Sequence, residues 1–221
     1  MSNPTYILRY FPLVGLSEAC RLLLTAANVE WTEEHPEWPQ EKPNQPHGRL
    51  PVLVEKNPDG SPDFIITESC NIERYLARVY GFVPADPKQA ARQEQICELM
   101  ADVFSYLSGY IRASSDESKQ MFLGKFEALL ETLIEVQTKL IEGNGNNGRQ
   151  FGDSLSYADM VAYGFYKKLM IAMARFDANV PKFVKSKLTP KITQLIATVE
   201  ADPLLEKHTS KAGSLAAAVS V

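Results

Sequence analysis

The sequence predicts an α/β domain followed by an all-α domain. Three observations support this prediction: the composition shifts near residue 86, strand and helix patterns alternate before that point, and long helical periodicities follow it. The first 86 residues hold 10 of the 14 prolines, with 12 acidic and 7 basic side chains, whereas the rest has 4 prolines, 15 acidic and 16 basic side chains. We expect domains at 1–83 and 84–221, because residues 81–87 (GFVPADP) are typical of a linker that ends in a helix start at Asp86-Pro87.

Composition excludes several functional classes. A chain of 221 residues with 45% hydrophobic residues can form a core without metal or disulfide support. The three cysteines, Cys20, Cys70 and Cys97, have no CxxC spacing and form an odd number, which indicates a reducing compartment. A net charge of -4 with no basic stripe argues against nucleic-acid binding. Without a basic leader or a long apolar run, we expect a cytoplasmic protein that does not bind a membrane.

The first part of the chain alternates between strand and helix signals. Residues 5–11 (TYILRYF) predict a strand and residues 17–27 (SEACRLLLTAA) a helix with a broad apolar face. Residues 52–54 and 64–66 flank the turn cluster at 57–60 (NPDG), which predicts a hairpin. From Ser69 onward, a helical spacing links the apolar residues Ile72, Tyr75, Leu76, Val79 and Tyr80. This order, β-α-(β)-β-β-α, predicts a layer of thioredoxin type.

The second part is helical throughout. One long helix is predicted by the apolar residues Ile96, Leu99, Met100, Val103, Leu107 and Ile111, and another by Phe122, Phe126, Leu129, Leu130, Leu133, Val136 and Leu140. A loop follows at 143–148 (GNGNNG), and Ser156 to Asp159 resembles a capping box. Two cap-plus-proline pairs, Thr189-Pro190 and Asp202-Pro203, predict at least one further helix and a short final turn.

The segment from Arg49 to Ser69 predicts a binding site for a small peptide-like anion. A cis Leu50-Pro51 bond would turn the backbone groups of Leu50 outward to pair with an extended ligand, whereas a trans proline would only delay strand pairing. Glu68 could accept hydrogen bonds from an ammonium group, beside a helix N-terminus that attracts an anion. The alternative is that Ser69 acts as a helix N-cap and nothing more. Adjacent cation and anion sites suit an α-amino acid end.

Other candidate residues lie upstream. Trp38 and Lys42 belong to a segment too rich in proline and charge for a core. If this segment folds over the anion site, Trp38 supplies an indole N–H, and Lys42 and Arg49 supply positive charge for a carboxylate. Otherwise the segment is a solvated loop. Tyr10 ends the predicted first strand, where side chains either pack or face a ligand crevice. A phenol hydroxyl pointing at a thiol would favour the thiolate, which is the nucleophilic form.

Together these motifs resemble the cytosolic glutathione S-transferases, most closely the sigma-like members of the pi, alpha and sigma group. The motifs are Tyr10-Phe11-Pro12, Trp38-Pro39-x-x-Lys42, GRLPVL at 48–53, Glu68-Ser69, and GDxxSxAD at 152–159. The resemblance implies the glutathione transferase fold, in which the helical domain contributes the electrophile site. It also implies glutathione as a co-substrate without any other cofactor or metal, a hydrophobic electrophile as second substrate, and a homodimer.

The resemblance further implies a role for each matching residue. Tyr10 would activate the glutathione sulfur, and it is the expected catalytic residue. The glycyl end of glutathione would be held by Trp38, Lys42 and Arg49, the cysteinyl part by the backbone at Leu50-Pro51, and the γ-glutamyl end by Glu68 and Ser69 with Asp102 of the partner subunit. The electrophile pocket is expected to be lined by residues 11–14, residues 106–111 and the C-terminal tail.

The expected activity is conjugation of the glutathione thiolate to small hydrophobic electrophiles, as in detoxification. Residues 13–16 (LVGL) lack the arginines that orient the tyrosine in sigma and pi members, so a water or a backbone amide would orient Tyr10. Glu68 stands where those classes usually have glutamine. Three alternatives remain: a glutathione-dependent isomerase or peroxidase, a noncatalytic relative such as the lens crystallins, and an activating Ser17 or Cys20 in place of Tyr10.

Overall fold

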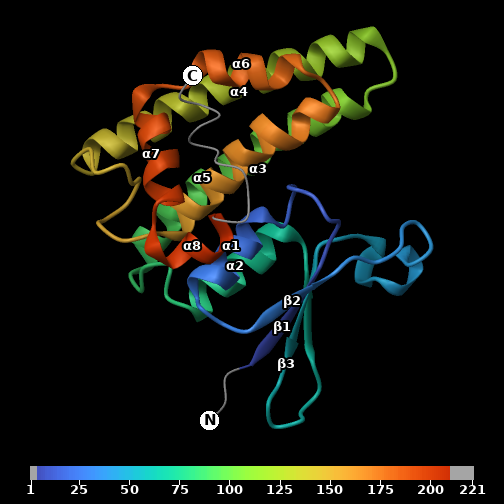
Figure 1. Ribbon diagram of the computed structural model, residues 1–221. Coiled ribbons are helices and arrows are strands. Elements are labelled where there is room, and N and C mark those ends of the chain that lie inside the picture. Colours follow the sequence, from blue (N-terminus) through green and yellow to red (C-terminus); the bar gives the residue numbers. More distant parts are fainter. Residues whose placement is uncertain (1–3, 210–221) are drawn as a thin grey trace.

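The computed structural model describes residues 4–209 of the chain (Figure 1). The strands are β1 (Thr5–Arg9), β2 (Trp31–Glu34), β3 (Val52–Lys56) and β4 (Phe64–Thr67). The α-helices are α1 (Glu18–Ala26), α2 (Ser69–Val79), α3 (Pro87–Arg112), α4 (Asp116–Gly143), α5 (Tyr157–Lys167), α6 (Asn179–Lys187), α7 (Pro190–Glu200) and α8 (Glu206–Thr209). A π-helical segment, Lys168–Ala172, follows α5 directly, and short 3-10 turns lie at Lys42–Asn44, Pro46–Gly48, Met173–Arg175 and Pro203–Leu205.

The four strands form one mixed sheet in the order β2-β1-β3-β4. β1 pairs parallel with β2 and antiparallel with β3, and β4 pairs antiparallel with β3. The hairpin predicted around residues 57–60 is therefore confirmed, with Val54 opposite Ile65. The first strand ends at Arg9 rather than at Phe11, because from Tyr10 onward the chain turns away to form the loop that leads into α1. This β-α-β-β-β-α layer is the predicted thioredoxin-like domain.

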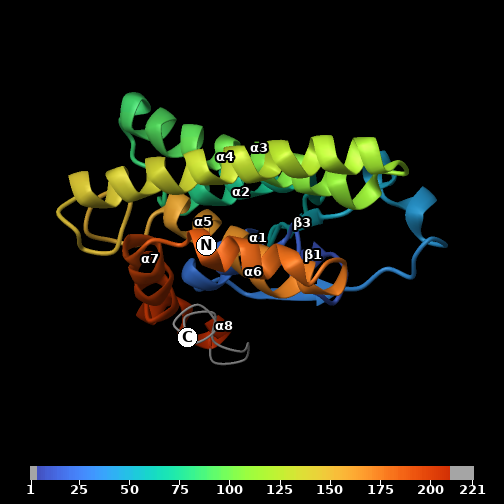
Figure 2. The same cartoon turned by 90° about the horizontal axis from the view of Figure 1, so that it is seen from above.

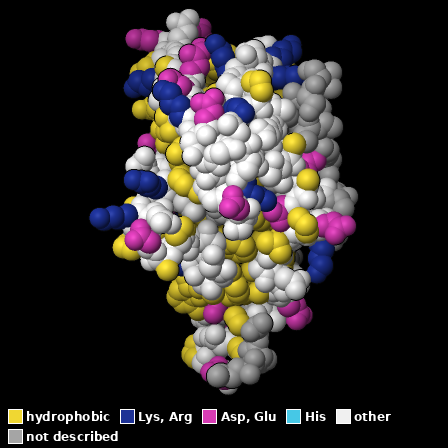
Figure 3. Space-filling model, turned by 90° about the vertical axis from the view of Figure 1, so that its left-hand side faces the viewer, with side chains coloured by type: hydrophobic (Ala, Val, Ile, Leu, Met, Phe, Trp, Pro, Cys, Tyr) yellow, Lys and Arg dark blue, Asp and Glu magenta, His cyan; other side chains and the backbone are white. Residues whose placement is uncertain are grey.

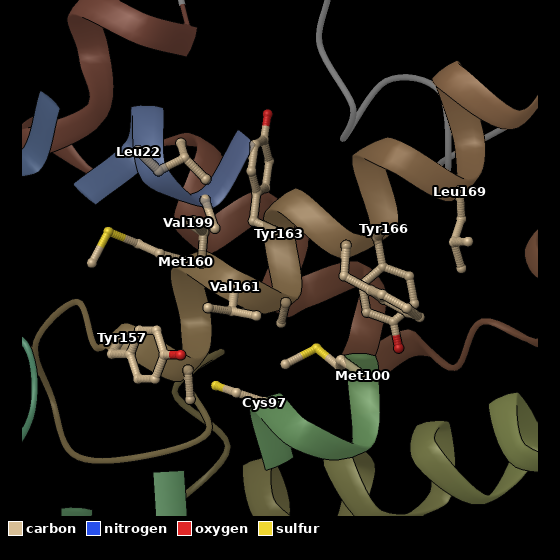
Figure 4. Packing of buried hydrophobic residues seen from close by; sticks show 14 of the residues in the cluster. Leu22, Cys97, Met100, Tyr157, Met160, Val161, Tyr163, Tyr166, Leu169 and Val199 are labelled. Atoms are coloured by element: carbon tan, nitrogen blue, oxygen red, sulfur yellow. The ribbon is translucent and has the colours of Figure 1, made fainter. Parts of the chain in front are cut away.

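Helices α1 and α2 pack on each other, and α1 also packs on α5, so these two helices lie between the sheet and the helical domain (Figures 1 and 2). The long helices α3 and α4 run side by side in both views. One hydrophobic core continues through both domains, from Tyr6 and Leu8 of β1 to Val199 of α7. Figure 4 shows part of this core, where Met100 of α3 lies close to α5. The two domains consequently share buried surface.

Local sequence signals account for several helix boundaries. Asp86 is the N-cap of α3, and its Oδ1 accepts hydrogen bonds from the N–H groups of Lys88 (3.0 Å) and Gln89 (2.8 Å). Thr189 caps α7 in the same way, through the N–H of Ile192. These predicted caps are confirmed. The sequence did not predict α6 or the π-helical segment.

The predicted capping box of α5 is also confirmed. Ser156 Oγ accepts a hydrogen bond from the N–H of Asp159 at 3.2 Å, and the Asp159 carboxylate accepts from the N–H of Ser156 at 3.3 Å. The same carboxylate accepts from the N–H of Gln150 at 2.9 Å, so it also fixes the loop before the helix. The start of α5 is therefore held by three bonds from two side chains.

Removing this cap should destabilise the helical domain. We expect Ser156→Ala to lower the free energy of unfolding by about 1 kcal/mol, because it leaves a buried helix N–H without an acceptor. Urea denaturation followed by circular dichroism measures the change. Ser154→Ala is the control, since Ser154 is exposed and makes no hydrogen bond to a described residue. Equal stability of the two variants would contradict the prediction.

Charged groups of both signs are mixed on the face shown in Figure 3, with hydrophobic side chains gathered toward its lower half. That face carries no large field of one sign, in agreement with the small net charge of -4. Between residues 4 and 209, no helix combines the length and the apolar character needed to span a bilayer.

Candidate functional site

A cleft of about 480 Å³ lies between the two domains. Its walls come from the loop before α1 (Gly15, Leu16), the first turns of α2 (Ser69, Glu73), one side of α3 and the end of α5. A volume of several hundred Å³ is typical of small-molecule sites. The cleft therefore joins the chain segments that the sequence singled out near Tyr10 and near Ser69.

Tyr10 follows β1 and is buried, with its hydroxyl directed at the start of α1. The Leu16 N–H donates a hydrogen bond to Tyr10 Oη at 2.9 Å. A Cβ on Gly15 would come within 2.5 Å of this oxygen, so only glycine leaves room beside it. Because a backbone amide already occupies one lone pair, the phenol proton remains available for donation to a ligand. The expectation that a backbone amide orients Tyr10 agrees with this geometry.

Burial raises the pKa of Tyr10, although the Leu16 N–H and the nearby Arg21 guanidinium act in the opposite direction. The hydroxyl consequently keeps its proton at neutral pH and acts as a hydrogen-bond donor, not as a base.

Arg21 of α1 holds the loop that follows Tyr10. Its Nη1 donates to the carbonyl oxygen of Leu13 at 3.1 Å, and its Nη2 donates to that of Phe11 at 3.3 Å. Its Nε donates to Glu33 Oε1 at 2.7 Å, and its Cζ lies 5.8 Å from the centroid of the Tyr10 ring. Arg21 thus fixes the loop from inside the fold, although residues 13–16 contain no arginine.

Arg21 belongs to a buried ion cluster centred on Glu18. Arg21 Nη1 lies 3.0 Å from Glu18 Oε2, and Lys167 Nζ and His208 Nε2 lie 2.6 Å and 2.9 Å from Glu18 Oε1. Burial alone would raise the pKa of Glu18, but the contacts with His208 and Lys167 outweigh it and lower the pKa to about 2. The cluster connects α1 with α5 and α8 and, through Arg21, with the loop beside Tyr10.

The start of α2 differs from the prediction at one point. Ser69 is not the N-cap: the helix begins at Ser69, and Glu68 precedes it with φ 65° and ψ 117°. The Glu68 carbonyl accepts the N–H groups of Asn71 and Ile72, both at 2.9 Å, so Glu68 holds the cap position without a side-chain cap bond. A non-glycine residue in this conformation is strained, which is typical of functional positions. Ser69 lines the cleft as the first helical residue.

The Glu68 carboxylate faces two basic side chains. Arg49 Nη1 lies 3.5 Å from Glu68 Oε1, and His47 Nδ1 lies 3.9 Å from the same oxygen. All three side chains are at least half exposed, so these contacts are weak and open to exchange with a ligand. The structure thus brings Arg49, Glu68 and Ser69 to one edge of the cleft.

The remaining predicted residues surround this edge. The Leu50-Pro51 bond is cis, and Leu50 lies just before β3, whose ladder begins at Val52. Trp38 packs edge-on against Phe11, with ring centroids 5.5 Å apart, and Phe11 packs in turn against Tyr10 at 5.4 Å. Lys42 is exposed and lies against Gly48.

Asp102 is exposed on α3 and does not line the cleft of its own chain. Its expected role concerns the partner subunit.

The two alternatives to Tyr10 are both buried away from the cleft. Ser17 is fully buried, and its Oγ has no hydrogen-bond partner among residues 4–209. Burial raises the pKa of the Cys20 thiol well above its usual value, so Cys20 is not a nucleophile. The structure therefore favours Tyr10 as the activating hydroxyl.

Part of the expected electrophile pocket needs correction. Gly15 and Leu16 line the cleft in place of residues 11–14, because Phe11 turns toward Trp38 and Leu13 is exposed. Within 106–111, the small residues Ser108 and Gly109 line the cleft. The sequence did not predict that α5 contributes to the cleft. The expected tail beyond Thr209 lies outside the described residues.

Four charged residues near the cleft were not predicted from the sequence: Glu18, Arg21, Glu73 and Lys168. A signal existed in each case, since each is a charged residue inside an otherwise apolar helical pattern. Such a residue is usually interpreted as part of a solvated face, and no partner is recognisable along the chain. Only the i, i+3 spacing of Glu18 and Arg21 indicates a pair.

A second cavity, of about 600 Å³, lies where residues 81–84 meet α3, α4 and the loop before α5. It is larger than the cleft but contains none of the residues predicted to bind or activate a ligand. Residues 4–209 also contain no group of three or more His, Cys, Asp or Glu side chains placed to hold a metal ion. The cleft beside Tyr10 is therefore the candidate site.

Comparison with known proteins identifies the family. The family model "Glutathione S-transferase, N-terminal domain" matches residues 7–78, and "Glutathione S-transferase, C-terminal domain" matches residues 101–212. The chain is also similar to Glutathione S-transferase P 2 of Bufo bufo, with 30% identity over 164 residues, or 70% of this chain and 72% of the relative. The chain belongs to the glutathione S-transferase family. The family resemblance found in the sequence is thereby confirmed.

The chain is also similar to S-crystallin 2 of Enteroctopus dofleini, with 25% identity over 224 residues, covering 94% of this chain and 98% of the relative. The sigma class glutathione S-transferase of Fasciola hepatica has the same fold, with a TM-score of 0.75 and 24% identity over 95% of this chain and 97% of that structure. The chain thus shares its fold with the sigma class protein and resembles the S-crystallin in sequence.

Proposed function

We propose that this chain is a glutathione transferase that conjugates the glutathione thiolate to small hydrophobic electrophiles, as in detoxification. The observation that carries the proposal is the buried Tyr10 hydroxyl, held by the Leu16 N–H at 2.9 Å beside two residues that line the cleft. Because Tyr10 keeps its proton, it can donate a hydrogen bond to sulfur and favour the thiolate. The sulfur then attacks the electrophilic carbon; with an aryl halide a C–S bond forms and halide leaves.

In this proposal the glutathione peptide spans the edge from Trp38 to Ser69. Lys42, Arg49 and the Trp38 indole bind the glycyl carboxylate, and the backbone at Leu50-Pro51 pairs with the cysteinyl part. Glu68 exchanges its contact with Arg49 for the γ-glutamyl ammonium group, and Ser69 at the start of α2 binds the γ-glutamyl carboxylate. No other cofactor takes part.

We further propose a cytoplasmic homodimer in which Asp102 of the partner subunit approaches the γ-glutamyl ammonium group. Asp102 is exposed on α3 and does not line the cleft of its own chain, so its side chain is free to face a partner subunit. The proposed domain boundary at 83/84 falls between the end of α2 at Val79 and the start of α3 at Pro87.

A second candidate is a noncatalytic glutathione-binding or structural relative. It is favoured by the S-crystallins among the similar proteins. An isomerase or a peroxidase would use the same thiolate and differ only in the second substrate.

Glutathione-affinity capture followed by a conjugation assay with 1-chloro-2,4-dinitrobenzene tests the proposal. We expect the full-length chain to be retained, to elute with free glutathione, and to form the conjugate faster than the uncatalysed reaction. Arg49→Gln should weaken capture, because it removes a cation from the glycyl end, whereas the exposed Lys125→Gln should not. Retention without turnover supports the noncatalytic candidate, and failure to bind glutathione contradicts both.

A further inference from the structure

Lys168, the residue after Lys167, has surroundings that the proposed reaction does not explain. Lys168 begins the π-helical segment after α5, is only 9% exposed, and lines the cleft. Its neighbour Lys167 is neutralised by Glu18 at 2.6 Å, whereas Lys168 makes no hydrogen bond or ion pair with any residue from 4 to 209. A buried ammonium group without an ion pair in direct contact is costly, so its retention needs a reason.

The ammonium group of Lys168 lies over aromatic faces. Its Nζ is 3.6 Å from the centroid of the Phe104 ring and 5.9 Å from that of Phe165. Cation–π contacts hold a cation in place without neutralising its charge. Both rings also line the cleft, so they provide an apolar wall beside a fixed positive charge.

Among the described residues that line the cleft, one is acidic. This residue is Glu73, which lies one turn after Ser69 in α2. It is 7% exposed and, like Lys168, makes no hydrogen bond or ion pair with a described residue. Burial raises the pKa of Glu73, against the charges of Lys168 and Arg74, and burial also lowers the pKa of Lys168. Glu73 and Lys168 act on each other electrostatically, but no hydrogen bond or ion pair joins them, so the donors of the lysine are not occupied by the carboxyl.

The rest of the cleft suits an apolar body. Met100 of α3 and Val161 of α5 line it, and Figure 4 shows these two side chains in the same part of the core. Gly15 and Leu16, beside the Tyr10 hydroxyl, line the same cleft as Lys168. A molecule of a few hundred Å³ could therefore present a reactive carbon to the sulfur while a charged end reaches the lysine. π-helical segments such as the one that begins at Lys168 are frequent at functional sites.

We propose that Lys168 binds a carboxylate of the second substrate, so that the chain prefers apolar electrophiles that carry one carboxylate group. This inference rests on the proposed transferase function. The lysine donates to the carboxylate oxygens, and Phe104 and Phe165 contact the apolar part. Lys168 is a specificity-determining residue in this scheme and takes no part in thiolate formation.

The test compares 4-chloro-3-nitrobenzoate with its methyl ester as acceptors of glutathione. The two compounds react at the same carbon, but only the acid carries a charge. We expect the acid-to-ester ratio of kcat/KM to fall about tenfold in Lys168→Met, since a charged hydrogen bond is lost, and to recover largely in Lys168→Arg. The ratio within each variant cancels any general loss of activity. Lys125→Met removes an exposed lysine that lies over the Tyr106 ring and should leave the ratio unchanged.

Two outcomes would overturn the inference while the transferase function stands. One is an unchanged ratio in Lys168→Met. The other is a ratio that falls in Arg112→Met and not in Lys168→Met, which would assign the charge to the other cation that lines the cleft. If the unchanged ratio in Lys168→Met is accompanied by a raised KM for glutathione, the lysine binds a glutathione carboxylate and not the second substrate.

Equilibrium binding separates this inference from the proposed function. Titration of 3-nitrobenzoate and methyl 3-nitrobenzoate into the glutathione-saturated protein requires no turnover. Preferential binding of the acid that is lost in Lys168→Met supports the anion site even if no acceptor is conjugated. Equal binding of acid and ester to the unmodified chain contradicts it.

Discussion

Tyr10→Phe is expected to lower kcat/KM for conjugation about a hundredfold. The substitution keeps the ring that packs against Phe11 and removes only the oxygen that accepts the Leu16 N–H at 2.9 Å and that, in the proposed reaction, donates to sulfur. Without that donor, the pKa of bound glutathione should rise toward the value of about 8.5 for a free thiol. The pH profile of kcat/KM measures this shift: its acidic limb should move to higher pH, so that activity partly recovers in alkaline solution.

Tyr6→Phe is the matched control. Tyr6 lies on the same strand and is also buried, but its hydroxyl bonds to Tyr80 Oη at 2.6 Å, away from the cleft. Its pH profile should match that of the unmodified chain. Ser17→Ala tests the alternative hydroxyl; a large loss there, with full activity in Tyr10→Phe, would show that Tyr10 is not the activating residue.

Glu18→Gln is expected to lower the free energy of unfolding by about 3 to 5 kcal/mol. It removes the carboxylate that meets Lys167, Arg21 and His208, and leaves Lys167, which is only 2% exposed, without an ion pair among the described residues. Breaking a buried ion pair from one side is costly because the remaining charge stays desolvated. Chemical denaturation followed by circular dichroism measures the loss, and Glu18→Asp serves as a milder variant if the glutamine variant does not fold.

Glu135→Gln is the control for Glu18→Gln, because it removes a carboxylate from an exposed ion pair. Glu135 Oε1 also lies 2.6 Å from a lysine Nζ, that of Lys139, but both side chains are at least 67% exposed. An exposed pair of this kind contributes little to stability, because solvent screens the two charges. Similar losses in the two variants would contradict the view that burial makes the Glu18 cluster important.

The Glu18 cluster also has a signature at acid pH. The pKa of Glu18 is lowered from 4.5 to about 2 in the folded chain. Its stabilising contribution, about 3 kcal/mol, is fully present above the unfolded value and is lost as pH falls toward 2. Stability should therefore decline between pH 4.5 and 2 more steeply in the unmodified chain than in Glu18→Gln. Parallel declines in the two proteins would show that Glu18 does not titrate in this way.

The sequence predicted the features that depend on neighbouring residues. Caps such as Asp86 and Ser156 and the turn at 57–60 act over a few positions, so the residue types alone indicate them. The position of Tyr10 beside a cleft followed from the end of a strand. The error at Ser69 also concerns a single residue: a serine at a helix start suggested a cap, but the strained backbone of Glu68 places the boundary one position earlier.

The sequence did not predict the features that depend on distant residues. Lys168 resembles any lysine near the end of a helix, and its burial results from packing against Phe104, 64 positions earlier in the sequence. Glu73 likewise occupies a charged position within an amphipathic pattern, yet the second domain covers it. Hydrophobic periodicity separates a buried face from a solvated one, but it does not reveal which solvated face another domain will bury.

The contacts of Glu18 impose an order on biosynthesis. Lys167 follows Glu18 by 149 positions and His208 by 190, so both leave the ribosome long after the loop that Arg21 fixes beside Tyr10. Contacts between residues so far apart in sequence form late, because closing long loops is entropically costly. Until α5 has emerged, only Arg21 can neutralise the Glu18 carboxylate. The buried ion cluster around Glu18 is therefore completed only when almost all of the residues up to His208 have emerged.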